Sequence, residues 1–171
     1  SSIYGFYGNK YKTIKIDYTN EEDAYGTGGA IKCALDYICD DTIIVVNGDT
    51  YFDINLNLMY KKHKLEFNDI TFATKFMKDC FRYGMIKINK KGKILDFIEK
   101  GVKSSGYING GYFMINKNLF KSTESKIFMF NDFIINNINN LKIGSISFND
   151  YFIDIGTPKD YARAQNYFKN A

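Results

Sequence analysis

The stretch Thr42-Ile43-Ile44-Val45-Val46-Asn47-Gly48-Asp49 decides which fold we expect for this chain. Residues 43–46 are continuously apolar and β-branched, as in a strand that is covered on both faces. The polar turn residues Asn-Gly-Asp then end the strand. Because open α/β sheets bind their ligands beyond the carboxyl ends of the strands, Asp49 is expected at a ligand-binding edge.

Strands and helices are expected to alternate on both sides of this stretch. Apolar residues recur with helical spacing after the glycine-rich loop 26–29, and further helices are expected at residues 55–65, 130–139 and from 158 to about 168. Strands are expected at residues 13–18, 69–76, 107–115, 143–148 and 151–155, with a β-hairpin at 85–99. This order predicts a single α/β domain over residues 1–171, with a mostly parallel sheet, helices on both faces and an inserted hairpin.

Composition narrows the classes of partner. The chain has 171 residues, 45% of them hydrophobic, which suits one domain with a sizeable core. The lysines behind the net charge of +4 are scattered, so no nucleic-acid-binding stripe is expected. No apolar run is long enough to cross a bilayer, so no membrane partner is expected. Three cysteines without metal-ligand spacing favour reduced thiols in the cytoplasm, and His63 is expected on the surface.

Two aspartates are the candidate metal ligands. Asp154 lies in Phe152-Ile153-Asp154-Ile155-Gly156-Thr157 with an apolar residue on each side, and a buried carboxylate is costly unless it is paired or binds a cation. Magnesium takes one or two carboxylates together with phosphate oxygens and water. Asp49 and Asp154 could therefore hold one Mg²⁺. The alternatives are that Asp49 forms a turn and caps the next helix, and that Asp154 is a structural residue.

Three further motifs carry little information singly. The loop Gly26-Thr27-Gly28-Gly29 could present backbone N–H groups to an anion or to the edge of a base. The glycine pair at 110–111 indicates the close approach of a ligand or of another part of the backbone. Glu99-Lys100, at the end of the hairpin, is equally typical of an exposed surface pair.

Taken together, the order and spacing of these motifs closely resemble the sugar-phosphate nucleotidyltransferases, the nucleotide-sugar pyrophosphorylases. The resemblance covers nearly the whole chain, and it is closest to guanylyltransferases that act on D-glycero-D-manno-heptose 1-phosphate or mannose 1-phosphate. The motifs that carry it are Glu21 with Gly26-Thr27-Gly28-Gly29-Ala30-Ile31, Val46-Asn47-Gly48-Asp49-Thr50, Tyr83-Gly84, Phe97-Ile98-Glu99-Lys100, Asn109-Gly110-Gly111-Tyr112 and Phe152-Ile153-Asp154-Ile155-Gly156-Thr157-Pro158.

The resemblance implies a Rossmann-like three-layer fold and a reaction in which a sugar 1-phosphate and a nucleoside triphosphate give a nucleotide-sugar and pyrophosphate, for capsule or surface polysaccharide. It also implies that the protein acts as a homodimer or homotetramer. The implied catalytic residues are Asp49, Lys100 and Asp154, of which Asp49 and Asp154 hold Mg²⁺. The implied nucleotide-binding residues are Glu21, Gly26, Thr27, Gly48 and Asp49. The implied sugar-phosphate-binding residues are Tyr83, Gly84, Glu99, Lys100, Asn109 and Gly110.

Glu21 permits a prediction about the base. An ionised carboxylate only accepts hydrogen bonds, and guanine presents two neighbouring donors, N1–H and N2–H₂, on one edge. Uracil and thymine present a donor between acceptors, which suits an amide better. The sequence therefore predicts GTP rather than UTP or dTTP, with the neighbours Glu22 and Asp23 as the alternative occupants of this role.

The chain departs from the family pattern at its beginning. Family members open with a strand, a phosphate-binding loop of the form Gly-Gly-x-Gly-Thr-Arg and a Lys-Pro segment, and residues 3–8 do not match that loop. These residues are expected instead to form the end of a helix. We therefore expect a truncated chain whose sheet lacks its first strand, with apolar residues exposed beside 43–46. We also expect it to be a weak catalyst, because lost charge stabilisers commonly cost on the order of 10²-fold or more.

Three alternatives to a guanylyltransferase remain at this point. One is a uridylyl- or thymidylyltransferase of the same family. Another is a metal-dependent glycosyltransferase that uses Asp49 and Asp53 as its pair of carboxylates and releases no pyrophosphate. The third is a non-catalytic subunit that binds a nucleotide or a sugar phosphate without turnover.

Overall fold

The structure, a computed structural model, describes residues 2–98 and 100–169. Contacts divide the chain into two compact units. The first consists of Ser1–Asp40 and Phe120–Phe133, and the second of Asp41–Leu119 and Ile134–Ala171. The expectation of a single domain stays a prediction.

A mixed β-sheet forms the centre of the second unit. In the order β7-β6-β8-β5-β9 the sheet contains Ile94–Ile98, Met85–Ile88, Gly106–Asn116, Ile70–Met77 and Ile143–Ser147. β3 (Thr42–Val46) joins this sheet by pairing with the second half of β8, and β6 pairs with its first half. The predicted hairpin is confirmed as β6–β7, and the α/β class is confirmed as well.

The directions of the strands qualify the prediction of a mostly parallel sheet. β3, β5, β6 and β9 point the same way, as predicted for a parallel sheet. Among the described strands, however, β5 and β9 are the one pair of direct neighbours that is parallel. The reason is that β8 runs in the opposite direction between β5 on one side and β3 and β6 on the other. Periodicity along the chain does not reveal the direction of such an inserted strand.

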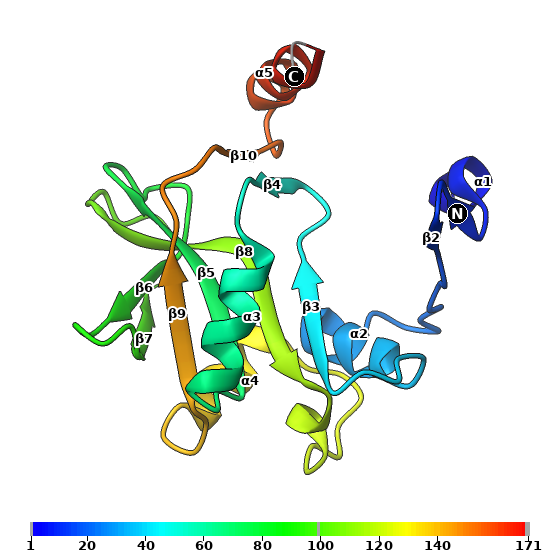
Figure 1. Ribbon diagram of the computed structural model, residues 1–171, viewed down its shortest axis with the longest axis horizontal. Coiled ribbons are helices and arrows are strands. Elements are labelled where there is room, and N and C mark those ends of the chain that lie inside the picture. Colours follow the sequence, from blue (N-terminus) through cyan, green and yellow to red (C-terminus); the bar gives the residue numbers. More distant parts are fainter. Residues whose placement is uncertain (1, 99, 170–171) are drawn as a thin grey trace. The chain divides into compact units, whose positions relative to one another are not determined.

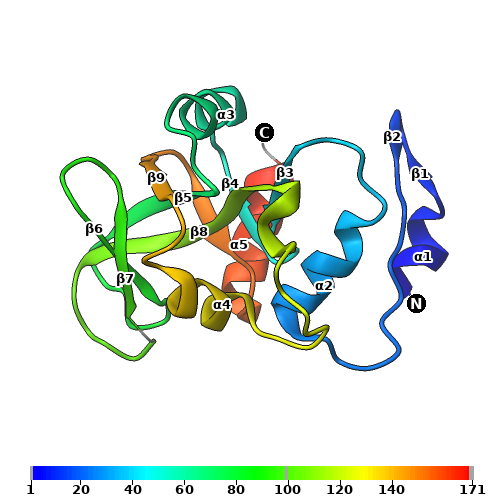
Figure 2. The ribbon, with the colours of Figure 1, turned by 90° about the horizontal axis from the view of Figure 1, so that it is seen from below.

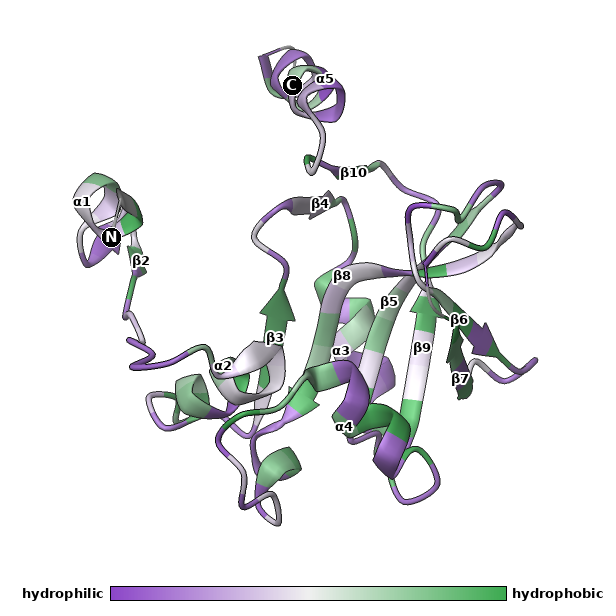
Figure 3. Ribbon diagram, turned by 180° about the vertical axis from the view of Figure 1, so that it is seen from behind, coloured by the Kyte–Doolittle hydropathy of each residue, from purple (hydrophilic) through white to green (hydrophobic). Residues whose placement is uncertain are grey.

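β3 has β8 as its pairing partner among the described residues. It is coloured as hydrophobic along most of its length in Figure 3. The side chains of Ile44 and Val46 are 37% and 45% exposed, whereas Ile43 is buried. The predicted exposure of apolar residues beside this strand is therefore confirmed.

A two-stranded ribbon lies beyond the carboxyl ends of β3 and β9 (Figure 1). It consists of β4 (Thr50–Phe52) and β10 (Phe152–Asp154), which pair antiparallel. Phe52 is buried and belongs to a core cluster with Met59, Ala73, Met114 and Phe148. The ribbon thereby joins the ends of two distant segments to the core.

Two helices of this unit begin at side-chain caps. Before α3 (Leu56–Leu65), the Asn55 side chain accepts the N–H of Leu58 at 2.9 Å. Before α5 (Pro158–Lys169), Thr157 Oγ1 accepts the N–H of Asp160 at 3.2 Å. Both starts agree with the sequence, because a cap satisfies N–H groups that have no partner within the helix. α3 covers one side of β5, β8 and β9 (Figure 2).

His63 corrects the expectation of a surface histidine. Its side chain is 1% exposed, on the face of α3 that packs on the sheet. Nδ1 lies 2.9 Å from Thr71 Oγ1, and Nε2 lies 3.0 Å from Asn116 Oδ1. Burial lowers the pKa of His63, so the imidazole is held neutral between two polar partners. The adjacent lysines suggested a solvated surface, but they lie on other faces of the same helix.

The first unit contains the N-terminal elements. Its elements are α1 (Ser2–Tyr7), the paired strands β1 (Lys10–Tyr11) and β2 (Ile14–Lys15), α2 (Gly26–Leu35) and the starting turn of α4 (Phe130–Asn137), and the 3₁₀ helix η1 (Lys117–Phe120) ends at its border. The predicted helix end at residues 3–8 is confirmed as α1. The strand expected at residues 13–18 is present only as the short β2, which pairs with β1.

The glycine-rich segment 26–29 was expected to be a loop, but the helix α2 already begins at Gly26. The carbonyl of Phe128 accepts the N–H groups of Gly28 and Gly29, at 3.0 and 3.2 Å. A Cβ at Gly28 or Gly29 would collide with residues 126–128. The glycines therefore permit close packing of the first helical turn against that segment.

Candidate functional site

The two candidate metal ligands lie at the same end of the β4–β10 ribbon, where Asp49 directly precedes β4 and Asp154 ends β10. Asp154 pairs with Thr50, and the N–H of Ile155 donates to the carbonyl of Asp49 at 2.9 Å. Asp49 is exposed, and the Asp154 side chain is 24% exposed. The structure thus brings together two aspartates that are far apart in the sequence, at the strand-end edge where the sequence predicts a ligand.

The Asn109-Gly110-Gly111 motif of β8 packs against the segment that contains Asn47 and β4. Asn47 donates its N–H to the carbonyl of Gly111 at 2.8 Å, and the Asn109 side chain accepts the N–H of Gly111 at 2.9 Å. A Cβ at Gly110 would lie 2.5 Å from the ring of Phe52. The sequence indicated that a ligand or another part of the backbone comes close to Gly110-Gly111. In the structure, β4 lies close to both glycines.

The predicted sugar-binding residues gather at the open end of the β6–β7 hairpin. Tyr83 and Gly84 precede β6, Lys100 follows β7 in an exposed turn, and the hairpin pairs Met85 with Ile98. Met85 also pairs with Ile108, the residue before Asn109. Three segments of the predicted sugar site thus meet at one end of this hairpin. Glu99 lies outside the described residues.

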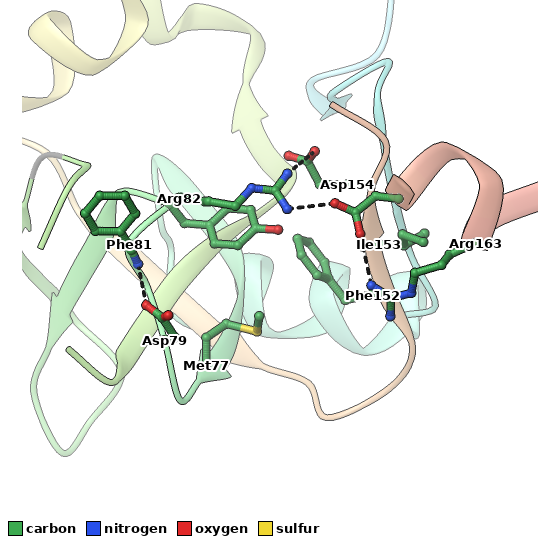
Figure 4. Close-up of a pocket in the computed structure, with 10 residues that line it drawn as sticks. Met77, Asp79, Phe81, Arg82, Phe152, Ile153, Asp154 and Arg163 are labelled. Atoms are coloured by element: carbon green, nitrogen blue, oxygen red, sulfur yellow. Dashed lines mark hydrogen bonds and ion pairs between the residues drawn. The ribbon is translucent and has the colours of Figure 1, made fainter. Parts of the chain in front are cut away.

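Arg82 connects this end of the hairpin to Asp154 and to α5 (Figure 4). Its Nη1 donates to Asp160 Oδ2 at 2.7 Å, and its Nη2 lies 3.6 Å from Asp154 Oδ1. Asp160 also accepts from the Thr157 hydroxyl at 2.8 Å and from Arg163 at 2.9 Å. Arg82, Asp154, Asp160 and Arg163 line a cavity of about 420 Å³, together with Met77, Asp79, Phe81, Tyr83, Phe152 and Ile153.

The electrostatics of this cavity follow from its ion pairs. The hydrogen bonds from Arg82 and Thr157 lower the pKa of Asp160 to about 2, so this carboxyl stays ionised. The hydrogen bond to Asp160 raises the pKa of Arg82. Burial raises the pKa of the Tyr83 hydroxyl, which keeps it a neutral hydrogen-bond donor. Three carboxylates, Asp79, Asp154 and Asp160, and two guanidinium groups, Arg82 and Arg163, lie around this cavity.

The side chains at the ribbon fit a magnesium ion that is held mainly by phosphates. Among residues 2–98 and 100–169, no three His, Cys, Asp or Glu side chains are grouped as an all-protein metal site. Mg²⁺ does not need one, because it keeps several waters and binds through one or two carboxylates and the substrate phosphates. Asp49 Oδ1 accepts the hydroxyl of Thr50 at 3.1 Å, and a carboxylate oxygen can accept more than one bond. The donor set agrees with Mg²⁺.

The predicted nucleotide-binding residues Glu21, Gly26 and Thr27 lie in the first unit, whereas Gly48 and Asp49 lie in the second. Glu21 Oε2 accepts the N–H of Tyr25 at 2.9 Å, and Thr27 Oγ1 accepts the N–H of Phe130 at 3.1 Å. Glu21 is exposed and each carboxylate oxygen has two lone pairs, so the structural bond to Tyr25 leaves acceptor capacity for a base.

Sequence reasoning did not identify Arg82, Asp160 and Arg163 as residues that line this cavity. Asp160 lies in the helix that was expected from residue 158, and no role was assigned to it. Arg82 directly precedes Tyr83-Gly84, and that adjacency was the one signal available for it. The partner of an arginine depends on tertiary contacts, which one sequence does not reveal.

The chain is similar to known nucleotidyl transferases in both sequence and structure. Residues 5–171 match the family described as nucleotidyl transferase. The chain is 38% identical over 162 residues to the D-glycero-alpha-D-manno-heptose 1-phosphate guanylyltransferase of Aneurinibacillus thermoaerophilus, covering 94% of this chain and 70% of that protein. It is 39% identical over 157 residues to the protein of the same name from Campylobacter jejuni, covering 91% and 69%. HddC from Yersinia pseudotuberculosis, solved with GMP-PN, matches with a TM-score of 0.78 and 30% identity over 90% of this chain and 67% of that one.

Proposed function

Because the chain belongs to the nucleotidyl transferase family, we propose that it transfers a guanylyl group from GTP to D-glycero-D-manno-heptose 1-phosphate. The products are the GDP-heptose and pyrophosphate. The observation that carries the proposal is the identity of 38–39% with two heptose 1-phosphate guanylyltransferases over more than nine-tenths of the chain. The relative solved with GMP-PN supports a guanine nucleotide.

In this reaction an oxygen of the sugar 1-phosphate attacks the α-phosphorus of GTP, and the bond from that phosphorus to the bridging oxygen of pyrophosphate breaks. The protein has to align the two phosphates and neutralise their charge. Asp49 and Asp154 hold Mg²⁺, which when bound offsets the negative charge of the phosphates. The pairing of Asp154 with Thr50 and the bond from Ile155 to the carbonyl of Asp49 support this assignment, because they bring the two aspartates to the same end of the ribbon.

The sugar phosphate is assigned to the open end of the β6–β7 hairpin. Lys100 is exposed there, and an ammonium group can neutralise a phosphate as a point charge. Tyr83 and Gly84 contact the sugar, together with Asn109, Gly110 and Glu99. The hydroxyl of Tyr83 serves as a donor because its pKa is raised by burial. The contact of Arg82 with both Asp160 and Asp154 supports a sugar site that adjoins the metal site.

The base is assigned to Glu21, with Gly26 and Thr27 beside it. A carboxylate that accepts from both N1–H and N2–H₂ of guanine selects GTP, and the exposure of Glu21 supports its access to a base. Gly48 contributes backbone next to Asp49. The nucleotide and the sugar phosphate thereby use different segments of the chain.

We further assign the reaction to the cytoplasm and to the synthesis of capsule or surface polysaccharide. The described cysteines, Cys33, Cys39 and Cys80, are all free thiols, which supports a reducing compartment. Among the described residues, no helix combines the length and the apolar character that crossing a membrane requires. A homodimer or homotetramer is the expected assembly, and size-exclusion chromatography with light scattering tests it.

Release of pyrophosphate by the full-length protein tests the proposed function. The assay crosses GTP, UTP and dTTP with D-glycero-D-manno-heptose 1-phosphate and mannose 1-phosphate in the presence of Mg²⁺. We expect the highest kcat/KM for GTP with the heptose phosphate. A preference for UTP or dTTP contradicts the guanylyl assignment, and a preference for mannose 1-phosphate contradicts the sugar assignment. Nucleotide binding without turnover indicates a binding subunit, and transfer from a nucleotide-sugar without pyrophosphate indicates a glycosyltransferase.

A further inference from the structure

Asp154 is held by one of its two carboxylate oxygens. Oδ1 accepts the N–H of Gly156 at 2.7 Å and lies 3.6 Å from Arg82 Nη2. For Oδ2, no partner occurs within the described part of the chain. Two contacts on the same oxygen fix the orientation of the carboxylate and leave the other oxygen available.

Arg82 itself is fixed by a stronger contact on its other nitrogen. Its Nη1 donates to Asp160 Oδ2 at 2.7 Å, and the Asp160 side chain is only 10% exposed. Asp160 is anchored in the first turn of α5 by Thr157. A guanidinium group is a planar fork, so fixing one nitrogen also fixes the direction of the second one, towards Asp154.

We propose that Arg82 is a positioning residue, which holds Asp154 through Oδ1 so that Oδ2 faces the divalent cation of the nucleotidyl transfer. This inference rests on the proposed function of Asp154. Carboxylates that bind metals are commonly oriented by a partner outside the metal's own ligands, and loss of such a partner typically costs about 10- to 100-fold in metal affinity or activity. Here the side-chain partner is Arg82, which contacts Asp154 as an ion pair at 3.6 Å rather than as a hydrogen bond. Arg82 also precedes Tyr83, so the same residue links the sugar-binding loop to the metal ligand.

The positive charge of Arg82 repels a divalent cation bound at Asp154, and this repulsion opposes the benefit of orienting the carboxylate. The charge of Arg82 is already compensated by Asp160 at 2.7 Å, and its side chain is 46% exposed to screening solvent. The four charged groups Arg82, Asp154, Asp160 and Arg163 carry no net charge together. The orientation of Asp154 therefore outweighs the repulsion, and removing Arg82 is expected to weaken the binding of metal.

Arg163 provides a matched control. Its Nη1 donates to Asp160 Oδ1 at 2.9 Å, so it binds the same carboxylate as Arg82. Among the described residues, Arg163 forms an ion pair with Asp160, whereas Arg82 forms ion pairs with both Asp160 and Asp154. Both Arg82→Ala and Arg163→Ala remove one guanidinium group from Asp160. Arg82→Ala also removes the contact with Asp154, whereas Arg163→Ala does not.

The test is the binding of Mn²⁺, as a spectroscopic substitute for Mg²⁺, to the full-length protein with GTP, measured from the free Mn²⁺ signal in electron paramagnetic resonance. We expect Arg82→Ala to weaken Mn²⁺ binding about 10-fold or more, at an unchanged affinity for GTP without metal, and Arg163→Ala to change it by less than about 2-fold. Equal or tighter Mn²⁺ binding in Arg82→Ala overturns the proposal. Equal weakening in both variants also overturns it, because the effect then belongs to Asp160.

Arg82→Lys keeps the charge and serves if Arg82→Ala does not fold. An ammonium group is a point charge that cannot reach both carboxylates in the way a guanidinium does. We therefore expect Arg82→Lys to weaken Mn²⁺ binding as well, and full affinity in this variant overturns a positioning role. Pyrophosphate release by the unaltered protein is measured separately. If it fails while Arg82→Ala still weakens Mn²⁺ binding selectively, the proposed function is wrong and the positioning role stands.

Discussion

Ile155 donates its backbone N–H to the carbonyl oxygen of Asp49 at 2.9 Å, and this bond joins the ends of the two segments that supply the candidate metal ligands. The bond continues the pairing of β4 with β10, in which Asp154 lies opposite Thr50. The two aspartates are thus fixed by backbone geometry rather than by a contact between their side chains.

Neutralising either aspartate is expected to abolish most of the activity. Asp49→Asn and Asp154→Asn keep the size of the side chain but remove the charge that a divalent cation requires. We expect kcat/KM to fall about 10²-fold or more, because stabilisers of the charge in the transition state commonly contribute that much. Pyrophosphate release at saturating Mg²⁺ measures the loss.

Asp53 is the matched control for this pair. It follows β4, and its N–H donates to the carbonyl of Tyr151 at 2.9 Å, a bond that Asp53→Asn does not alter. We expect Asp53→Asn to change kcat/KM by about 2-fold or less, as for an ordinary surface substitution. A large loss in Asp53→Asn together with activity in Asp154→Asn would favour the glycosyltransferase alternative, which pairs Asp49 with Asp53.

Glu21→Gln is expected to alter the choice of nucleotide. The amide keeps one acceptor but presents a donor where guanine also presents one. Loss of a charged hydrogen bond and an unsatisfied donor should lower kcat/KM for GTP roughly 10- to 100-fold, with a smaller change for UTP. Competition between GTP and UTP in the pyrophosphate assay measures the ratio. Glu22→Gln is the control, and a shift of the ratio in that variant alone would move the role to Glu22.

Gly110→Ala is expected to destabilise the fold. The added Cβ would lie 2.5 Å from the ring of Phe52 and 3.0 Å from the carbonyl oxygen of Ala73. Overpacking of this kind costs about 1–3 kcal/mol in the free energy of unfolding, which urea denaturation measures. Gly48→Ala is the control, because no atom lies within 4 Å of its added Cβ, and its stability should change by less than about 0.5 kcal/mol. Equal stability of the two variants would contradict the packing seen here.

The free energy of unfolding is expected to decrease as the pH drops below the pKa of an ordinary histidine. The pKa of His63 is lowered from 6.5 by burial, so above pH 6.5 it is neutral in both the folded and the unfolded chain. As the pH falls below 6.5, the unfolded chain binds a proton first, and the free energy of unfolding decreases until the pH reaches the pKa of the folded state. Urea denaturation between about pH 5 and pH 8 measures this slope.

His63→Gln provides the comparison, because the chain has one histidine. The variant should lose most of the pH dependence in this window. Two acid effects lie at lower pH. Burial acts to raise the pKa of Glu66, but the hydrogen bonds from Lys62 and Asn68 lower it from its ordinary 4.5, so its contribution to stability is lost as the pH falls below that value. Asp160, with a pKa of about 2 against its ordinary 3.8, contributes stability that is lost as the pH falls through that interval. A slope that persists in His63→Gln above pH 5 would mean that another group is responsible.

Local patterns predicted the elements and the positions of the motifs well. The cap at Thr157 and the strand before Asp49 depend on neighbouring residues, and the structure contains both. The placement of β8 between β3 and β5 was not predictable, because strand order depends on contacts distant in sequence. The same holds for the contacts of Arg82.

The spacing of residues in the expected helix 55–65 does indicate that His63 is buried, although the sequence analysis placed it on the surface. Met59 and His63 are four residues apart in α3, so they lie on the same face, and both are buried. Lys64, on one side of His63, is exposed, and Lys62, on the other side, pairs with Glu66 at 2.6 Å. Reading that segment as a basic run obscured the periodicity, although the apolar residue one turn earlier already indicated an inward-facing position.

The β4–β10 ribbon also has a consequence for the order of folding. Its partner strands are about 100 residues apart in the sequence, and pairings of such separation form after local hairpins and helices because the loop between them must be closed first. The β6–β7 hairpin needs only a short turn and can form early. The predicted sugar-binding end of the hairpin is therefore expected to assemble before the two aspartates meet, so that the candidate metal site forms among the last steps of folding.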